Sequence, residues 1–183
     1  LASVHAKAAE IHNGTLMKEE NTYINGWICT DGGDGVGGFV NPGYDRQAYS
    51  NYNIKQLQSN RTISPVTRDF QFQPNSTYIT GKSTDLLFHP HYYGTWYTGS
   101  GTKLYLTRDN GFTYEEIYNF GVDVAAMDMC HADPDVLYAC TFPDWWGTKR
   151  IYRSLNGGAT WTEITPPAAL MNNEHLWIPY DIT

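Results

Sequence analysis

The stretch Thr107-Arg108-Asp109-Asn110-Gly111-Phe112-Thr113-Tyr114 is matched in pattern by Ser154-Leu155-Asn156-Gly157-Gly158-Ala159-Thr160-Trp161, which begins 47 positions further along the chain. The shared positions are a hydroxyl residue, Asp or Asn, Gly, Thr and an aromatic residue: Thr107, Asp109, Gly111, Thr113 and Tyr114, then Ser154, Asn156, Gly158, Thr160 and Trp161. Asp and Asn side chains accept backbone N–H bonds in tight turns, and glycine adopts the positive φ that such turns need. The two stretches therefore predict two equivalent turns, and these decide the fold.

The segments on either side of the two stretches repeat as well. Residues 103–106 and 150–153 precede them, and residues 115–117 and 162–164 follow them. These short runs mix apolar, aromatic and polar residues in the manner of β-strands. Each unit is therefore expected to be a β-hairpin, with the aromatic residue at the start of the outgoing strand.

This motif resembles the Asp-box, also called the BNR repeat, of the sialidase-like β-propellers. That superfamily includes sialidases, sortilin-type domains and xyloglucanase-like glycosidases. The sequence departs from the family pattern at Asn156, which replaces Asp, and at Tyr114, which replaces Trp. The resemblance implies an all-β propeller of four-stranded antiparallel blades, in which the boxes are structural turns on the rim away from the ligand face.

The spacing of prolines and strands supports a repeat of blade length. Pro42, Pro90 and Pro134 each close a predicted first strand, at intervals of 48 and 44 residues. We expect blades at about 21–64, 77–120 and 121–165, with a further blade starting at 174–183. Residues 59–62 are interpreted as a decayed box. The expected strands are 23–29, 39–40, 47–52, 55–59, 85–90, 94–98, 102–106, 125–130, 136–141 and 149–153.

A propeller closes with about four to eight blades, so residues 1–183 are expected to form one partial propeller, a segment of a larger protein. The remaining blades would lie in the parent chain or in another chain. Residues 1–22 show little pattern, and we assign no structure to them beyond a short helical turn or the tail of a preceding strand.

Composition excludes several classes of partner. The formal net charge of −7 argues against nucleic acid and anionic membrane surfaces, because both need basic patches. No apolar run is long enough to span a membrane. The sequons at Asn13, Asn60 and Asn75 favour an exported protein, secreted or at the cell surface. Cys130 and Cys140 are expected on neighbouring strands, as a cross-strand disulfide or as free buried thiols.

An acidic, glycine-rich cluster, Asp31-Gly32-Gly33-Asp34-Gly35, follows Trp27. It resembles a segment common in bacterial Asp-box propellers, which lies near the propeller axis. Asp31 and Asp34 are candidates for a catalytic acid or base of a glycosidase, or for calcium ligands, and a glycine-rich bend is the structural alternative. A second carboxylate is required for hydrolysis, and its candidates are Asp85, Asp128 and Asp144.

The segment Phe142-Pro143-Asp144-Trp145-Trp146-Gly147 is the best candidate for ligand binding. The distance from proline to box is 17 residues in the second unit and 20 in the third, which places the extra length here. Trp145 and Trp146 would stack on sugar rings while Asp144 binds hydroxyl groups. The alternative is that one tryptophan fills the gap between blades.

Two other chemistries find little support. The arginines are Arg46, Arg61, Arg68, Arg108, Arg150 and Arg153, and they show no cluster of the kind that a sialidase uses for the substrate carboxylate. His89-Pro90-His91 hints at a metal pair, but no third ligand is evident, so no metal is predicted. No cofactor is expected, apart from calcium as an alternative at the acidic cluster.

The sequence therefore predicts an exported propeller segment that acts as a non-catalytic module and binds glycan or protein at the cell surface. The alternative is a xyloglucanase-like glycoside hydrolase that uses inward-facing Asp residues. Whether the protein is an enzyme stays open, with the balance of the sequence against it.

Overall fold

The computed structural model describes residues 5–10, 14–19, 28–31, 38–43, 47–50, 56–59, 68–71, 84, 86–141 and 149–167. Within these residues all regular structure is β-strand. The strands are β1 (His5–Glu10), β2 (Gly14–Glu19), β3 (Ile28–Asp31), β4 (Gly38–Val40), β5 (Gln47–Ser50), β6 (Gln56–Ser59), β7 (Arg68–Gln71), β8 (Leu87–Phe88), β9 (Trp96–Ser100), β10 (Lys103–Thr107), β11 (Glu115–Asn119), β12 (Val124–Met129), β13 (Leu137–Thr141), β14 (Arg150–Ser154) and β15 (Thr162–Glu163). The described part of the chain contains no helix with the length and hydropathy needed to cross a membrane.

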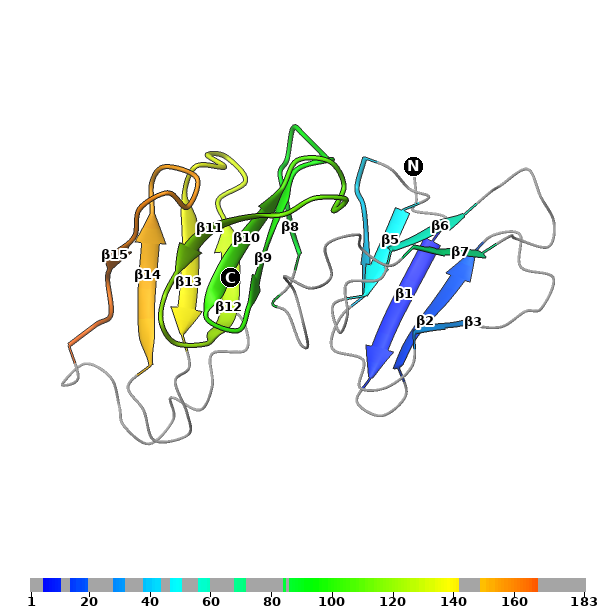
Figure 1. Ribbon diagram of the computed structural model, residues 1–183, viewed down its shortest axis with the longest axis horizontal. Coiled ribbons are helices and arrows are strands. Elements are labelled where there is room, and N and C mark those ends of the chain that lie inside the picture. The colour runs from blue at the N-terminus through cyan, green and yellow to red at the C-terminus, as the bar shows by residue number, and fades with distance from the viewer. Residues whose placement is uncertain are drawn as a thin grey trace.

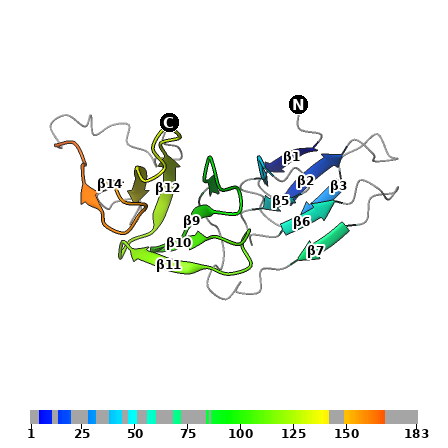
Figure 2. The same cartoon turned by 90° about the horizontal axis from the view of Figure 1, so that it is seen from above.

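The strands form four antiparallel sheets, in the orders β1-β2-β3, β4-β5-β6-β7, β8-β9-β10-β11 and β12-β13-β14-β15. We call these sheets A, B, C and D. Each strand pairs with the next one along the chain, so every sheet is a simple meander. Figure 1 shows the sheets side by side, from A and B in blue and cyan to D in yellow and orange, and Figure 2 shows them from above. The prediction of an all-β fold built of four-stranded propeller blades is confirmed.

The strand expected at 23–29 does not open the first four-stranded unit. Strand β3 pairs with β2, with Leu16 opposite Cys29 and Met17 opposite Ile28, and so belongs to sheet A. Sheet B instead begins at β4 and takes its fourth strand from β7, where Ser59 pairs with Arg68. Residues 1–22, for which we expected no more than a short helical turn or the tail of a preceding strand, contribute the hairpin β1–β2.

The first and second strands of sheets B, C and D share one register. Val40 pairs with Ala48, Phe88 with Trp96, and Met129 with Leu137, so each pair is eight positions apart. Pro42 and Pro90 are therefore equivalent, two residues after the first strand. Pro134 is five residues after Met129, so its assignment as the equivalent of these prolines was wrong.

This register locates the extra length of sheet D. Trp96 and Leu137 are equivalent and 41 residues apart, whereas Thr107 and Ser154, which end the third strands, are 47 residues apart. In sheet C a turn of two residues joins Ser100 to Lys103, but in sheet D the connection runs from Thr141 to Arg150. The difference is six residues, not the three that the proline spacing suggested, and it falls entirely in the 142–149 connection.

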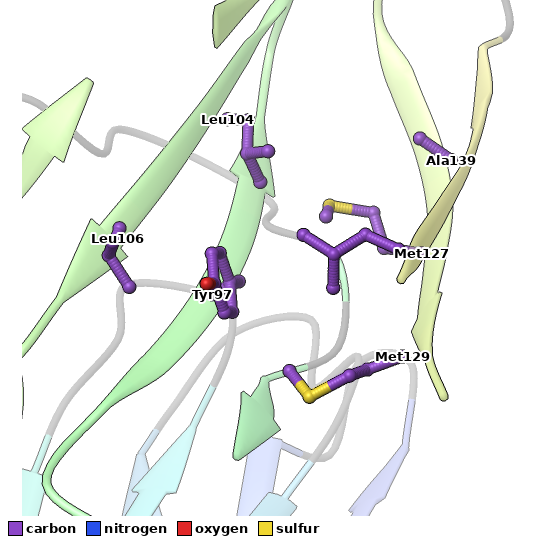
Figure 3. Packing of buried hydrophobic residues seen from close by; sticks show 7 residues of the cluster. Tyr97, Leu104, Leu106, Met127, Met129 and Ala139 are labelled. Carbon is purple, nitrogen blue, oxygen red and sulfur yellow. The ribbon is translucent and has the colours of Figure 1, made fainter. Parts of the chain in front are cut away.

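Apolar side chains between sheets C and D form one core. It consists of Tyr97, Leu104, Leu106, Met127, Met129, Leu137 and Ala139, each at most 6% exposed. Figure 3 shows Tyr97, Leu104 and Leu106 of sheet C directed toward Met127 and Met129 of sheet D. Burial of this area stabilises the pair of sheets, because neither sheet can cover its apolar face alone.

Aromatic rings join sheets B and C. Tyr49 on β5 lies 5.9 Å from Phe88 and 5.5 Å from Trp96, between ring centroids, and both Tyr49 and Trp96 are fully buried. Burial raises the pKa of Tyr49 to about 12, against the effect of a hydrogen bond with Asn41. The phenol is therefore neutral at physiological pH, as a packed interface requires.

Cys130 and Cys140 are both free thiols, and the cross-strand disulfide considered from the sequence is excluded by the register. Cys140 lies opposite Ala126, whereas Cys130 follows the end of the same strand. Four residues of extended chain separate Ala126 from Cys130, a distance of roughly 13 Å along the strand. A disulfide needs the two Cα atoms within roughly 7 Å of one another.

Candidate functional site

The repeated stretches form two corners of the same hydrogen-bonded geometry. We call residues 107–114 the first polar corner and residues 154–161 the second. In the first, the Thr107 hydroxyl accepts the Gly111 N–H at 2.8 Å and donates to Asp109 Oδ1 at 2.8 Å. Asp109 also accepts the Thr113 N–H at 2.9 Å and the Thr113 hydroxyl at 2.6 Å.

The second polar corner repeats these bonds with an amide in place of the carboxylate. The Ser154 hydroxyl accepts the Gly158 N–H at 2.9 Å and donates to Asn156 Oδ1 at 3.0 Å, and that oxygen accepts the Thr160 N–H at 2.9 Å. Asn156 Nδ2 donates to the Thr160 hydroxyl at 2.8 Å. In the first corner the hydroxyl is the donor, since Thr113 donates to Asp109. Gly111 and Gly158 both have φ near 87°.

Asp109 is held by this turn and is not directed at a ligand. Partial burial raises its pKa, but the hydrogen bonds from Thr113, Thr107 and Phe112 outweigh burial and leave the pKa below its usual value. The carboxylate is therefore ionised at neutral pH and its acceptor positions are used inside the corner.

The corner aromatics reach the core. Trp161 packs on Tyr118 and Phe120 of sheet C, at centroid distances of 6.1 and 5.1 Å, and its Nε1 donates to Gly158 O at 2.9 Å. Tyr114 packs on Trp96 at 5.4 Å. Each corner thus ties a turn to the interface between neighbouring sheets, which is a structural role.

The corners define one end of the sheets, which we call the corner end. The Asn110 N–H donates to Gly94 O, and the Gly157 N–H donates to Asp135 O, both at 2.9 Å. These bonds join each corner to the connection between the first and second strands of the same sheet. The corner end therefore carries the connections 89–95 and 130–136, and Asn41, which follows β4, lies there too because it bonds to Tyr93 O.

Polar side chains cap two of these connections at equivalent positions. Asn41 is fully buried, accepts the Gly43 N–H at 2.9 Å, and donates to Tyr93 O at 2.7 Å across to sheet C. His89 accepts the N–H groups of His91 and Tyr92 at 3.1 and 3.2 Å through Nδ1. Burial and the neighbouring His91 lower the pKa of His89, with Asp135 opposing the shift.

This geometry bears on the histidine pair. His89 Nδ1 is used for turn hydrogen bonds, and the His89 and His91 rings lie 5.9 Å apart between centroids. Within the described residues there is no group of three His, Cys, Asp or Glu side chains that could hold a metal ion. His89 is therefore a turn residue in this fold.

A cavity of about 540 Å³ lies where the inner strands of three sheets meet the corner end. Its walls come from sheets B, C and D: Phe39, Pro42, Leu86, Leu87, Phe88, Pro90, Tyr93, Asp128, Met129 and His131. Pro42 and Pro90 are equivalent residues of sheets B and C. Both line the cavity, and each follows the end of the inner strand of its sheet by two residues. That repeat and the candidate carboxylate Asp128 are the sequence signals of the cavity, and the remaining lining residues were not predicted as a site.

Asp128 is the one candidate carboxylate whose side chain the structure places in a cavity. It is the fifth residue of β12, and its Oδ1 accepts the Met129 N–H at 2.7 Å. His131, exposed at the start of the following connection, and the phenol of Tyr93 are further polar side chains in the wall. The lining therefore combines aromatic and prolyl surfaces with one carboxylate and one imidazole.

The other end of the sheets, which we call the loop end, carries the remaining candidates. Val124 opens β12 and donates to Gly101 O of sheet C at 2.8 Å, and Thr141 pairs with both Val124 and Arg150. The 142–149 connection therefore leaves from and returns to this end. Gly38, the first residue of β4, is at the same end, because Asn41 lies at the corner end with Tyr93.

Asp31 is the last residue of β3, so the segment that follows it leads into the loop end of β4. The side chain of Asp31 lies outside the described part of the structure, as do Asp34, Asp85, Asp144, Trp145 and Trp146. The start of β4, which follows the acidic cluster in the sequence, and the strand ends on either side of the 142–149 connection thus lie at one end of the sheets, and the polar corners lie at the other.

Four of the arginines lie in the described part of the chain, and Arg68 opens β7, the fourth strand of sheet B. Arg108 pairs with Glu115 at 2.7 Å and Arg150 pairs with Glu163 at 3.0 Å, both between third and fourth strands. Arg153 lies on β14, the third strand of sheet D. Among the described residues, the cavity lining contains no arginine or lysine.

Comparison with solved structures agrees with this architecture. An ancestral GH74 enzyme matches with a TM-score of 0.63 and 15% identity over 88% of this chain. The GH74 enzyme of Niastella koreensis matches with a TM-score of 0.61 and 15% identity over 88% of this chain. The GH74 xyloglucanase of Xanthomonas campestris matches with a TM-score of 0.56 and 12% identity over 87%.

The chain spans only 22%, 27% and 28% of the length of these three proteins, respectively. No protein-family model matches the sequence, and no curated protein matches it. Fold and sheet order therefore place the chain among the β-propellers, as a set of consecutive blades. Structural matches at this level of sequence identity establish the fold alone. The activity has to be argued from the site.

Proposed function

We propose that the chain is part of an exported, carbohydrate-active β-propeller of the Asp-box type, and that its loop end binds a glycan. The observation that supports this proposal is that the described strand ends next to both sequence candidates lie at one end of the sheets. The segment after Asp31 and the 142–149 connection meet the sheets at the loop end, while the hydrogen-bonded corners occupy the other. Loops at one end of a rigid scaffold are where propellers and sandwiches carry their ligand sites.

The six additional residues of the 142–149 connection support a ligand role. Sheet C makes the equivalent connection with a turn of two residues, so sheet D does not need the longer one to form its hairpin. The additional length contains Asp144, Trp145 and Trp146, which supply flat apolar faces and a hydroxyl acceptor. A propeller that completes its wheel with further blades, in the same or another chain, would present this segment beside those blades.

A second candidate is hydrolysis of the bound glycan, and the comparisons favour it. All three similar structures are GH74 enzymes and one is a xyloglucanase, although none exceeds 15% identity. Hydrolysis needs two carboxylates roughly 5–9.5 Å apart on either side of the glycosidic bond. Asp31 or Asp34 would supply one of them, and Asp144 would supply the other.

Binding and hydrolysis are tested separately in the full-length protein that contains this chain. The double variant Trp145→Ala/Trp146→Ala should weaken binding of a xyloglucan oligosaccharide by about tenfold or more, since two stacking faces are lost. Phe112→Ala is the matched control, because Phe112 is an aromatic residue 39% exposed at the corner end. Equal affinity of the double variant and the control would disprove the glycan-binding proposal.

Hydrolysis is measured as reducing-sugar release from xyloglucan. Asp34→Asn and Asp31→Asn keep the shape of the side chain and remove its acid or base function. Loss of release by a factor of about a hundred or more, with binding retained, would support the hydrolase. Full release of sugar by both variants would assign catalysis to other residues. No release by the wild-type protein would contradict the hydrolase and favour a non-catalytic glycan-binding module.

A further inference from the structure

The corner-end cavity is a site that neither the acidic cluster nor the tryptophan segment explains. Its volume of about 540 Å³ is within the range of small-molecule sites, roughly 300–1,000 Å³. It is built by side chains from three consecutive sheets, so the sheet packing itself fixes its shape. Tyr93, one wall residue, is anchored through its backbone oxygen to the fully buried Asn41 of sheet B.

The packing around Tyr93 is close. A Cβ atom on Gly43 would overlap the Tyr93 ring, so the ring lies directly against the glycine backbone. Tyr93 is nevertheless 38% exposed, so part of this residue remains accessible. The cavity therefore has a fixed aromatic surface and does not depend on a mobile side chain.

The polar side-chain groups of the wall are few: Asp128 and His131 of sheet D, and the hydroxyl of Tyr93. Asp128 uses Oδ1 for the Met129 N–H and has a second carboxylate oxygen with acceptor capacity. His131 provides an imidazole that donates or accepts according to its tautomer. Pro42, Phe39 and the ring face of Tyr93 present apolar surfaces in the same wall.

This combination fits a pyranose ring better than the other common ligand classes. A pyranose has an apolar C–H face for an aromatic or prolyl surface and hydroxyl groups at its edge for a carboxylate and an imidazole. An anionic ligand is disfavoured, because the described lining has a carboxylate and neither arginine nor lysine. A purely apolar ligand would leave Asp128 desolvated without compensation.

We propose that this cavity is a second, non-catalytic carbohydrate site that holds one neutral pyranose residue at the corner end of the propeller. The choice of a glycan as ligand rests on the proposed function, and the site is separate from the one proposed at the loop end. A long polysaccharide would then be contacted at two points, which raises its affinity without a new contact at the loop end.

The test uses the full-length protein and calorimetric titration with cellotetraose and with a xyloglucan oligosaccharide. Asp128→Asn retains an oxygen for the Met129 N–H and removes the charge, and His131→Ala removes an exposed ring. Each variant should weaken the corner-end site by about tenfold, the usual effect of one charge-assisted hydrogen bond. Glu163→Gln, which changes an exposed carboxylate on the outer strand β15, is the matched control and should bind as the wild type does.

The outcomes separate the two proposals. Two binding sites in the wild type, one of them weakened in Asp128→Asn and His131→Ala with an unchanged melting temperature, support the cavity site. Weakening by these variants while Trp145→Ala/Trp146→Ala binds normally would support the cavity site and overturn the loop-end proposal. Binding unaffected by Asp128→Asn and His131→Ala would overturn the cavity site, and absence of binding by the wild type would overturn both.

Discussion

Asp109 accepts two hydrogen bonds from Thr113, one from the backbone N–H at 2.9 Å and one from the hydroxyl at 2.6 Å. Asn156 and Thr160 form the corresponding pair in sheet D, also through the N–H at 2.9 Å. The chain therefore contains one corner closed by a group that titrates and one closed by a group that does not. This difference provides an internal control for the energetics of the turn.

We expect the first polar corner to lose stability in acid. The pKa of Asp109 is lowered in the folded state, so its contribution is present above the unfolded pKa of about 4 and is lost as pH falls through the folded pKa. Asp109→Asn should remove this acid dependence and retain the turn, because Asn156 shows that an amide closes it. The measurement is the free energy of unfolding by urea between about pH 7 and about pH 3. Asn156→Asp should add the same dependence, and identical pH profiles for wild type and Asp109→Asn would contradict the expectation.

Gly158→Ala should destabilise the protein more than Gly101→Ala. Both glycines have positive φ, at 87° and 55°, so both variants bear the cost of a left-handed alanine, about 1–2 kcal/mol. At Gly158 a Cβ would also lie 2.8 Å from Ile117 Cδ1 and 3.2 Å from Leu104 Cδ2, whereas at Gly101 nothing lies within 4 Å. Overpacking adds about 1–3 kcal/mol at Gly158. Equal losses in a urea titration would mean that sheets C and D do not meet at this corner.

Leu104→Ala should cost about 2–5 kcal/mol of unfolding free energy, because Leu104 is fully buried between sheets C and D. Its neighbour Lys103 is the matched control. Lys103 pairs with Glu116 at 2.7 Å on the surface, with 39% and 42% of the two side chains exposed. Lys103→Ala is expected to leave stability unchanged within error, and the same holds in high salt. A large loss for Lys103→Ala would show that the cross-strand ion pairs stabilise the blades.

The interface between sheets B and C should weaken at alkaline pH. Burial raises the pKa of Tyr49 to about 12, so the stability it contributes is fully present below about pH 10 and is lost as pH rises toward about 12. Tyr49→Phe keeps the ring against Trp96 and Phe88 and removes the ionisable group. The free energy of unfolding of Tyr49→Phe should therefore fall less steeply above about pH 10 than that of the wild type. An equally steep fall of the free energy of unfolding in both proteins would mean that a group other than Tyr49 causes the alkaline transition.

The inner-strand register shows where sequence reasoning reached its limit. Pro134 occurs at nearly the spacing of Pro42 and Pro90, but hydrogen bonding puts it three positions later in its connection. Likewise, the sequence around β3 predicted the first strand of a blade, but β3 pairs with β2 in sheet A. A strand carries little information about its partner, because the partner is chosen by hydrogen bonds and packing with residues that are distant in the chain.

The sequence by itself determined the two polar corners, the all-β class and the blade-length repeat. Each depends on local chemistry: Asp109 and Asn156 find their hydrogen-bond donors within four residues, and Gly111 and Gly158 adopt a backbone that other residues resist. Only the tertiary structure decided that Cys130 and Cys140 are apart, that Tyr49 packs against Trp96, and that Phe39, Tyr93 and Asp128 share a cavity. Those relationships join three sheets, and burial of apolar surface between sheets, which has no direction along the chain, is what fixes them.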